Sequence, residues 1–154
     1  MGAVWEEVRL VIAAYIDASV LLRVILVEDD PLDEWPDLEL GVSSQIVRVE
    51  CHRTLHRLWL HGQLDDSEYE EKSSKVEAMI RYLELLAVDD GVIARAKAPL
   101  PVALTSLDAV HLASAMLYRS TQPEDERPLV FATHDIALAR AAHAMHFDVI
   151  GVAV

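Results

Sequence analysis

Four acidic residues stand where carboxylates could bind a divalent cation. Asp17 directly ends a continuous apolar run, and Asp135 follows shortly after a second one. Glu50 lies at the edge of an apolar helical stripe, and Asp108 lies in the first turn of another predicted helix. Carboxylates held close together repel, which raises the pKa of at least one of them until a hard cation such as Mg²⁺ neutralises the charge. If the fold gathers these residues, the chemistry open to them is metal-ion binding.

Each acid also has a purely structural interpretation. Asp17 and Asp135 precede predicted helices, and Asp is a favoured residue at a helix N-cap. Glu50 could face solvent, and Asp108 could complement its helix dipole, which is worth about 0.3 to 1 kcal/mol. For any one acid alone the structural interpretation is the better one. The combination of all four is what points to a site.

The apolar runs that carry two of these acids are predicted strands. Segment 8–16 ends in a continuous apolar stretch, as in a strand buried on both faces of a parallel sheet, and 129–133 is a second buried strand; 38–42 and 147–154 are two further candidates. Ligands bind outside the carboxyl ends of the strands in open α/β sheets. Asp17 and Asp135 are therefore expected at that edge.

Helices are predicted between the strands. Ser19 lies near the first helix start, Ser43 or Ser44 caps the second, Ser67 and Glu70 form a capping box for the third, and Thr105 or Ser106 opens the fifth. The six segments are 19–26, 44–62, 67–86, 91–98, 106–118 and 136–146, and 28–39 is an acid-rich loop. Strands that alternate with helices imply a mostly parallel sheet covered on both faces.

Length and composition predict one globular domain over residues 1–154 and restrict its setting. Of the residues, 53% are hydrophobic, which is ample for a core. The single cysteine, Cys51, forms no internal disulfide, which favours the cytoplasm, and the apolar runs are shorter than the ~20 residues of a membrane span. A net charge of −13 argues against nucleic-acid binding by electrostatics alone and suits a basic protein partner or a bound cation.

Four short motifs, in this order, resemble the PIN domain, and more narrowly the VapC-type toxin ribonucleases of toxin-antitoxin pairs. They are Tyr-Ile-Asp-Ala-Ser at 15–19, Val-Glu-Cys-His-Arg at 49–53, Leu-Asp-Ala-Val-His-Leu-Ala-Ser-Ala at 107–115 and Thr-His-Asp at 133–135. The third motif is the most specific. The likeness covers most of the chain and fills all four acidic positions of the family.

The resemblance implies a three-layer α/β/α fold in which the four acids converge on Mg²⁺ or Mn²⁺, with Ser19 and Thr133 supporting the carboxylates. We assign Asp17 and Asp108 to direct metal contact and Glu50 and Asp135 to contact through water or a second ion, because Mg²⁺ keeps several waters. The implied activity is hydrolysis of RNA by a metal-activated water, giving 5′-phosphate and 3′-hydroxyl products. Arg53, Arg57 and Arg23 are candidate phosphate contacts.

The resemblance also implies partners: an RNA substrate, a cognate antitoxin that covers the acidic pocket, and a second copy in a homodimer. His111 belongs to the third motif and is expected to contribute to packing. His52 and His56 have a helical spacing that can share a metal, but without a third ligand they are expected to be surface or half-buried histidines.

Three other functions fit the sequence less well. A PIN-like binding module without turnover is disfavoured by the intact acidic set. An aspartyl-phosphate phosphatase would need a second Asp where Ser19 stands, and a phospho-receiver would need an acid pair before the end of the first strand and a late lysine.

Residues 1–7 depart from the family pattern. Chains of this family usually begin within a few residues of their first strand, whereas here seven residues precede it. We interpret these residues as a genuine extension, an expression remnant or a misassigned start.

Overall fold

A five-stranded, fully parallel sheet forms the centre of the described chain. The computed structural model describes residues 12–26, 33–123 and 128–152. Its strands are β1 (Ile12–Ile16), β2 (Leu38–Ser44), β3 (Leu83–Leu86), β4 (Val130–Ala132) and β5 (Val149–Ile150). They lie in the order β3-β2-β1-β4-β5, and each neighbouring pair is parallel. The prediction of a mostly parallel sheet is confirmed.

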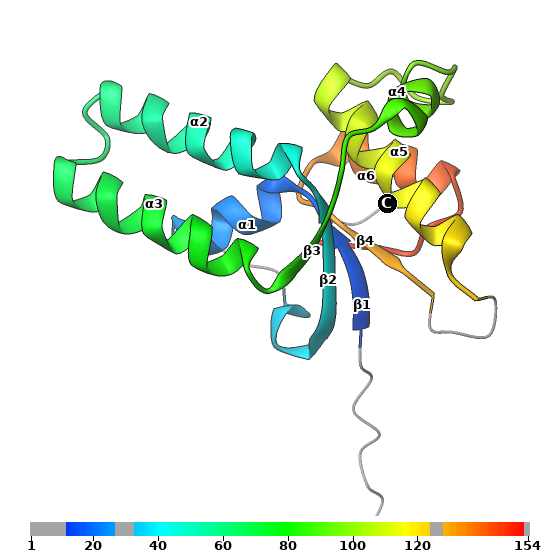
Figure 1. Ribbon diagram of the computed structural model, residues 1–154, viewed down its shortest axis with the longest axis horizontal. Coiled ribbons are helices and arrows are strands. Elements are labelled where there is room, and N and C mark those ends of the chain that lie inside the picture. Colours follow the sequence, from blue (N-terminus) through cyan, green and yellow to red (C-terminus); the bar gives the residue numbers. More distant parts are fainter. Residues whose placement is uncertain (1–11, 27–32, 124–127, 153–154) are drawn as a thin grey trace, which may run out of the picture.

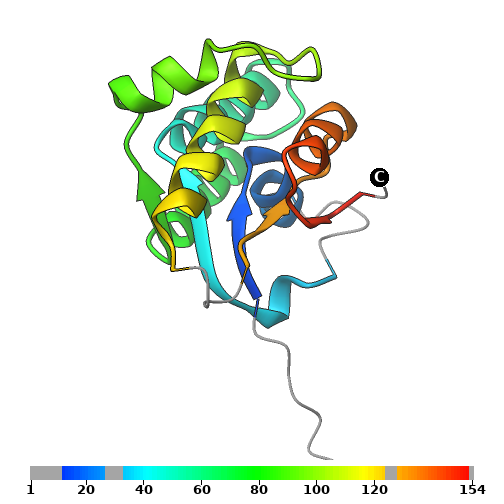
Figure 2. The same ribbon diagram turned by 90° about the vertical axis from the view of Figure 1, so that its right-hand side faces the viewer.

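Helices cover both faces of this sheet, as Figures 1 and 2 show. One face is covered by α1 (Ala18–Ile25), α2 (Ile46–Leu60) and α3 (Asp66–Ile80). The other face is covered by α5 (Ser106–Thr121) and α6 (Ile136–Ala144), and α4 (Asp90–Ala96) packs against α5. The predicted three-layer α/β/α arrangement is therefore present.

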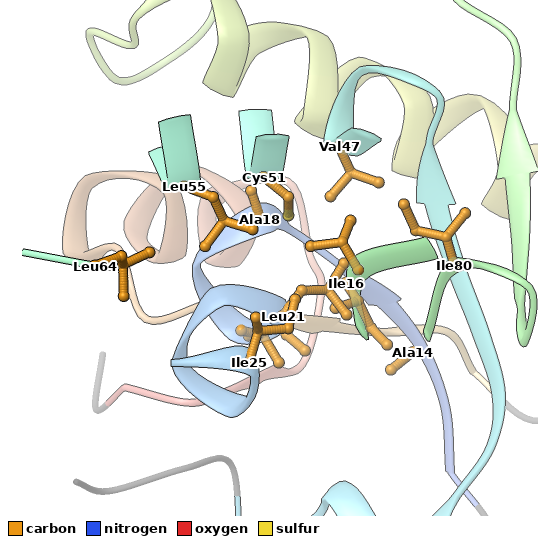
Figure 3. Packing of buried hydrophobic residues seen from close by; sticks show 13 residues of the cluster. Ala14, Ile16, Ala18, Leu21, Ile25, Val47, Cys51, Leu55, Leu64 and Ile80 are labelled. Atoms are coloured by element: carbon orange, nitrogen blue, oxygen red, sulfur yellow. The ribbon is translucent and has the colours of Figure 1, made fainter. Parts of the chain in front are cut away.

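The central strand supplies side chains to both cores. Ala14 and Ile16 point toward α1 and α2, where Figure 3 shows them among Leu21, Cys51 and other buried side chains. Tyr15 points to the opposite face, where its ring stacks on Phe131 with centroids 5.2 Å apart. Burial on both faces explains why this strand is a continuous apolar run rather than an alternating one.

The strand order creates a switch point between β1 and β4. The chain leaves β1 through α1 toward β2 on one side, and leaves β4 through α6 toward β5 on the other. At such a switch point the two outgoing connections separate and leave a crevice at the carboxyl ends of the strands, which is where ligands bind in α/β folds. Asp17 follows β1 and Asp135 follows β4 at this edge.

The predicted third helix was wrong at both ends. Its N-cap is Asp65 rather than Ser67, and Asp65 and Glu68 form the capping box. Leu83 and Leu86, expected on its apolar face, belong instead to β3 at the sheet edge. The apolar residues happen to keep helical spacing across the turn at Arg81 and Tyr82, so periodicity alone did not reveal the change.

Other boundaries differ by smaller amounts. Asp17, not Ser19, caps α1. Strand β2 continues through Ser43 and Ser44, and the N-cap of α2 is Gln45, although the Ser44 hydroxyl still accepts a hydrogen bond from the Ile46 N–H. Within the predicted acidic loop, Trp35–Asp37 form a short 3₁₀ helix. Thr105 caps α5 as expected.

Some predictions lie outside the described residues: the extension at 1–7, the start of the first strand at 8–11, part of the acidic loop at 27–32, and the last residues of the final strand at 153–154. Among the described residues, the search for a helix of the length and apolarity that a membrane crossing requires found none.

Candidate functional site

Asp17 is a buried carboxylate held by three donors. Its side chain is the N-cap of α1, where Oδ1 accepts from the Val20 N–H at 3.3 Å and from the Ser19 hydroxyl at 2.6 Å. Oδ2 accepts from the Thr133 hydroxyl at 2.6 Å. Burial raises the pKa of Asp17 above its ordinary value, while the hydrogen bonds from Ser19 and Thr133 oppose that rise. The hydrogen bonds therefore hold the Asp17 carboxylate in one orientation, but they do not fully offset the cost of burying its negative charge.

Ser19 and Thr133 tie Asp17 to the turn after β4. The Ser19 hydroxyl accepts from the His134 N–H at 2.9 Å, and the Thr133 hydroxyl accepts from the Asp135 N–H at 3.0 Å. Gly151 packs against this turn with a φ of +106°, and a Cβ there would lie 2.2 Å from the Thr133 carbonyl oxygen. A glycine at this position therefore lets β5 approach the turn closely.

Asp135 and Asp108 come to the same edge from two helices on the far face of the sheet. Asp135 is the N-cap of α6, and its side chain accepts a hydrogen bond from the Leu138 N–H at 2.8 Å. Asp135 is exposed. Asp108 lies in the first turn of α5, where its N–H donates to the Thr105 hydroxyl at 3.3 Å. Burial raises the pKa of Asp108, and the negative charges of Asp135 and then Asp17 raise it further. Asp108 is therefore close enough to Asp135 and to Asp17 for the charge of each to act on it.

Glu50 reaches the site from α2, in the opposite helical layer. Its side chain is 18% exposed, and Oε1 lies 2.5 Å from Nε2 of His111, which is fully buried in α5. The other ring nitrogen of His111 lies 2.7 Å from the Tyr15 hydroxyl. Burial raises the pKa of Tyr15 and of Cys51, and the charges of Asp17 and Glu50 raise both further, so the two acids lie near the same part of the core.

The structural interpretation of two of these acids is compatible with the site interpretation. Asp17 and Asp135 are indeed helix N-caps, as the simpler interpretation expected. Capping uses Oδ1 of each carboxylate. A cap also aims its carboxylate at the positive end of a helix dipole, which helps to hold the charge in place.

The donor set fits a hard divalent cation. Within residues 12–26, 33–123 and 128–152, no group of three or more His, Cys, Asp or Glu side chains is placed to hold a metal ion by itself. Mg²⁺ does not need such a group, because it binds through one or two carboxylates and retains several waters. Burial raises the pKa of Asp17, and burial and neighbouring negative charges raise the pKa of Asp108, so both carboxylates would gain from a cation nearby.

The three arginines predicted from the sequence as phosphate contacts lie on α1 and α2. Arg53 and Arg57 are exposed on α2, three and seven positions after Glu50, so they share its helical face. Arg23 lies in the last turn of α1 and is half-buried.

His111 is the residue that sequence reasoning undervalued. It was expected to serve packing, yet both of its ring nitrogens are hydrogen-bonded, one of them to a candidate site acid. A usable signal was present, because His111 follows Asp108 by three positions and so lies on the same face of the same helix. His52, in contrast, is half-buried and pairs with Glu77, as expected for a surface histidine.

Comparison with known proteins agrees with this geometry. The family model described as the PIN domain matches residues 14–144. Ribonuclease VapC35 of Mycobacterium tuberculosis is 29% identical over 141 residues, covering 88% of this chain and 94% of the relative. Ribonuclease VapC46 of the same organism is 33% identical over 106 residues, covering 67% of this chain and 74% of the relative.

A solved structure shows the same fold. A toxin-antitoxin complex from Klebsiella pneumoniae contains a chain with a TM-score of 0.53 and 16% identity, over 80% of this chain and 87% of that one. The family match extends from within β1 to the end of α6 and so includes all four acids. This protein belongs to the PIN-domain family, and within it to the VapC-type proteins.

Proposed function

We propose that this protein is a Mg²⁺-dependent endoribonuclease, the toxin of a toxin-antitoxin pair, which hydrolyses RNA phosphodiester bonds with a metal-activated water. One observation carries the proposal. The negative charges of Asp17 and Asp135, which follow β1 and β4 at the switch point, both raise the pKa of Asp108, in a chain related to named VapC ribonucleases. A carboxylate whose pKa is raised by burial and by neighbouring charges costs stability when it is ionised, and a bound cation would offset that cost.

Two groups of residues would act in the site: the four acids would bind the cation, and two hydroxyl residues would orient one of the carboxylates. Asp17 and Asp108 would bind the cation directly, and Glu50 and Asp135 would bind through water or a second ion. Ser19 and Thr133 hold the Asp17 carboxylate in one orientation through two short hydrogen bonds. When bound, Mg²⁺ or Mn²⁺ would supply the charge that lowers the pKa of a water and stabilises the leaving oxygen.

RNA would approach along the face of α2 that carries Glu50. Arg53 and Arg57 are exposed on that face and would contact phosphates on either side of the scissile bond. The net charge of −13 makes this a weak electrostatic surface for RNA, so the bound cation would contribute much of the attraction.

The proposal includes a basic antitoxin, a homodimer and a cytoplasmic setting. A chain of similar fold has been solved within a toxin-antitoxin complex. The acidic site and the net charge of −13 suit a partner segment that carries arginine. Light scattering of the purified protein tests the dimer, and binding of an arginine-containing candidate antitoxin to the purified protein tests the partner.

The test of the activity is cleavage of a pooled RNA substrate by the purified protein in Mg²⁺ or Mn²⁺, with EDTA as the metal-free control. Asp17→Asn and Asp108→Asn each remove one negative charge while preserving side-chain size, and each should abolish cleavage. Asp148→Asn is the matched control, because Asp148 is exposed next to β5 and away from the four acids, and it should cleave as the wild type does.

Two outcomes would contradict the proposal. The first is cleavage that persists in EDTA or in both site variants, since that activity would not belong to these carboxylates. The second is a wild-type protein that neither cleaves RNA nor gains thermal stability with either metal. The chain would then be a PIN-like binding module without turnover.

A further inference from the structure

His111 connects the two helical layers at the candidate site. Its ring is completely buried in α5, with Nε2 2.5 Å from Glu50 on α2 and Nδ1 2.7 Å from Tyr15 on β1. The ring of Tyr15 contacts the His111 ring edge-on at 5.8 Å and stacks on Phe131 at 5.2 Å. A fully packed pair of aromatic rings therefore holds the imidazole that faces Glu50.

The direction of the hydrogen bonds follows from the partners. Nε2 faces a carboxylate oxygen, which only accepts, so Nε2 carries the hydrogen and donates it. In the neutral ring Nδ1 then has a lone pair, and the Tyr15 hydroxyl donates to it. The hydroxyls of Ser43 and Ser114 lie nearby, but their hydrogens are donated elsewhere: to the carbonyls of Ile16 and Val110, at 2.6 and 2.7 Å.

Glu50 needs such a support more than the other three acids. Asp17 and Asp135 are held by N–H groups of the helices that they cap, and Asp108 lies in a first helical turn fixed by Thr105. Glu50 lies within α2, away from free backbone N–H groups, and has a longer side chain with more rotamers to lose. Held through Oε1, a carboxylate can still offer Oε2 to a cation or a water.

We propose that Tyr15 and His111 form a buried hydrogen-bond relay in which His111 is a positioning residue that orients Glu50 for the reaction. The inference rests on the proposed function, because it assumes that Glu50 belongs to the active site. The proposal gives His111, the histidine of the third motif, a role beyond packing. Histidines and carboxylates arranged in this way orient groups around metal sites, and their loss typically costs about 10- to 100-fold in activity or metal affinity.

Three variants separate positioning from packing. His111→Leu fills the same space without a donor, His111→Gln places an amide N–H near the position of Nε2, and Tyr15→Phe removes the hydroxyl that fixes the ring. We expect His111→Leu to lower kcat about 10- to 100-fold with KM for RNA within about twofold. His111→Gln should recover most of that loss, and Tyr15→Phe should show a smaller loss in the same direction.

Thermal unfolding identifies any variant that fails to fold, and the other two variants then carry the test. A His111→Leu protein that folds and keeps wild-type kcat would overturn the proposal. So would a His111→Gln protein as inactive as His111→Leu, since a donor near Nε2 would then have no effect.

A second measurement needs neither activity nor metal. In ¹⁵N-labelled wild-type protein in EDTA, we expect a slowly exchanging proton on Nε2 of His111, shifted downfield by its buried hydrogen bond to Glu50. That resonance should move in Glu50→Gln and stay in place in the control Glu77→Gln. A hydrogen found on Nδ1 alone, or a resonance insensitive to Glu50→Gln, would contradict the relay.

The two measurements distinguish failure of this inference from failure of the proposed function. If the wild type cleaves no RNA, the proposed function fails, and the resonance of His111 still reports whether the relay exists. If the wild type cleaves RNA and the histidine variants are fully active, the ribonuclease assignment stands and the role of His111 is wrong.

Discussion

Helix α2 carries two histidine–carboxylate pairs whose surroundings differ sharply. Glu50 pairs with His111 of α5, and the two side chains are 18% and 0% exposed. Two positions further along, His52 pairs with Glu77 of α3, and these side chains are 34% and 42% exposed. The hydrogen-bond distances are similar, 2.5 and 2.7 Å. Burial separates the two pairs, and so does the third group: the buried Tyr15 hydroxyl bonds to His111, whereas the exposed Arg48 lies 3.6 Å from Glu77.

The difference shows why the same two residue types serve different purposes. Water surrounds the His52–Glu77 pair and screens its charges, so an exposed pair of this kind contributes about 0 to 1 kcal/mol. Around Glu50 and His111 water is scarce, and each partner depends on the other for its hydrogen bond. Burying such a pair costs desolvation free energy, and removing one partner leaves the other buried and unpaired. These costs are consistent with a functional role for the pair.

The largest contrast should appear in catalysis. Glu50→Gln preserves the shape of the side chain and removes the charge that would help to hold the cation, so we expect kcat to fall about 100-fold or more. Glu77→Gln makes the same chemical change in the exposed pair and should leave kcat within about twofold. Steady-state cleavage of a short RNA in Mg²⁺ measures both, and equal effects of the two changes would show that burial does not separate the pairs.

Metal binding should show a contrast of similar size in thermal stability. A cation present at about 100 times its Kd stabilises the folded state by about 2.7 kcal/mol, or roughly 5 to 11 °C for a chain of this length. Wild type and Glu77→Gln should show this gain, whereas Asp108→Asn should lose most of it. Differential scanning fluorimetry with Mn²⁺ makes the measurement, and an equal gain in Asp108→Asn would remove that residue from the ligand set.

The same experiment without metal has an expected sign. The pKa of Asp108 is raised in the folded state, so its contribution to stability is present below the unfolded pKa and is lost as the pH rises through the folded pKa. At pH 7 in EDTA the ionised group therefore costs stability, and Asp108→Asn should unfold at a higher temperature than wild type.

Removal of one partner should cost more in the buried pair. Glu50→Ala leaves the Nε2–H of a fully buried histidine without an acceptor, which typically costs about 1 to 3 kcal/mol. Glu77→Ala leaves His52 free to bond to water and should cost about 0 to 1 kcal/mol. Chemical denaturation in EDTA compares the two, and a larger cost for Glu77→Ala would reverse the comparison.

The smallest expected effect is the pH dependence of the exposed pair. The hydrogen bond from His52, aided by Arg48, lowers the pKa of Glu77 in the folded state. Its contribution to stability is therefore present above the unfolded pKa of about 4.3 and is lost as the pH falls through the folded value. The difference in unfolding temperature between wild type and Glu77→Gln should vanish at low pH. A difference that grows on acidification would show that the sign is wrong.

Much of the architecture was predictable because local signals agreed with the fold. The apolar runs before Asp17 and before Thr133 predicted the two strands that flank the switch point, and Thr105 predicted the start of α5. The parallel sheet followed from the alternation of strands and helices. These features depend on burial and capping, which the sequence displays directly.

The remainder depended on contacts between distant residues. Leu83 and Leu86 became a strand because they pair with β2, although their spacing continued that of α3. Ser67 and Glu70 have a capping-box spacing, yet α3 begins earlier, with Asp65 as its N-cap and Glu68 as the partner in the capping box. The partnership of His111 with Glu50 joins residues 61 positions apart, so the helical face that His111 shares with Asp108 indicates the region of the site but not this partner.

The most direct test of the central claim is a crystal structure of the protein with Mn²⁺, in which anomalous scattering locates the ion independently of the atomic model. The account predicts an anomalous peak in contact with the carboxylates of Asp17 and Asp108, absent in Asp108→Asn. No peak at saturating Mn²⁺, or peaks only at sites away from the β1–β4 switch point, would contradict it.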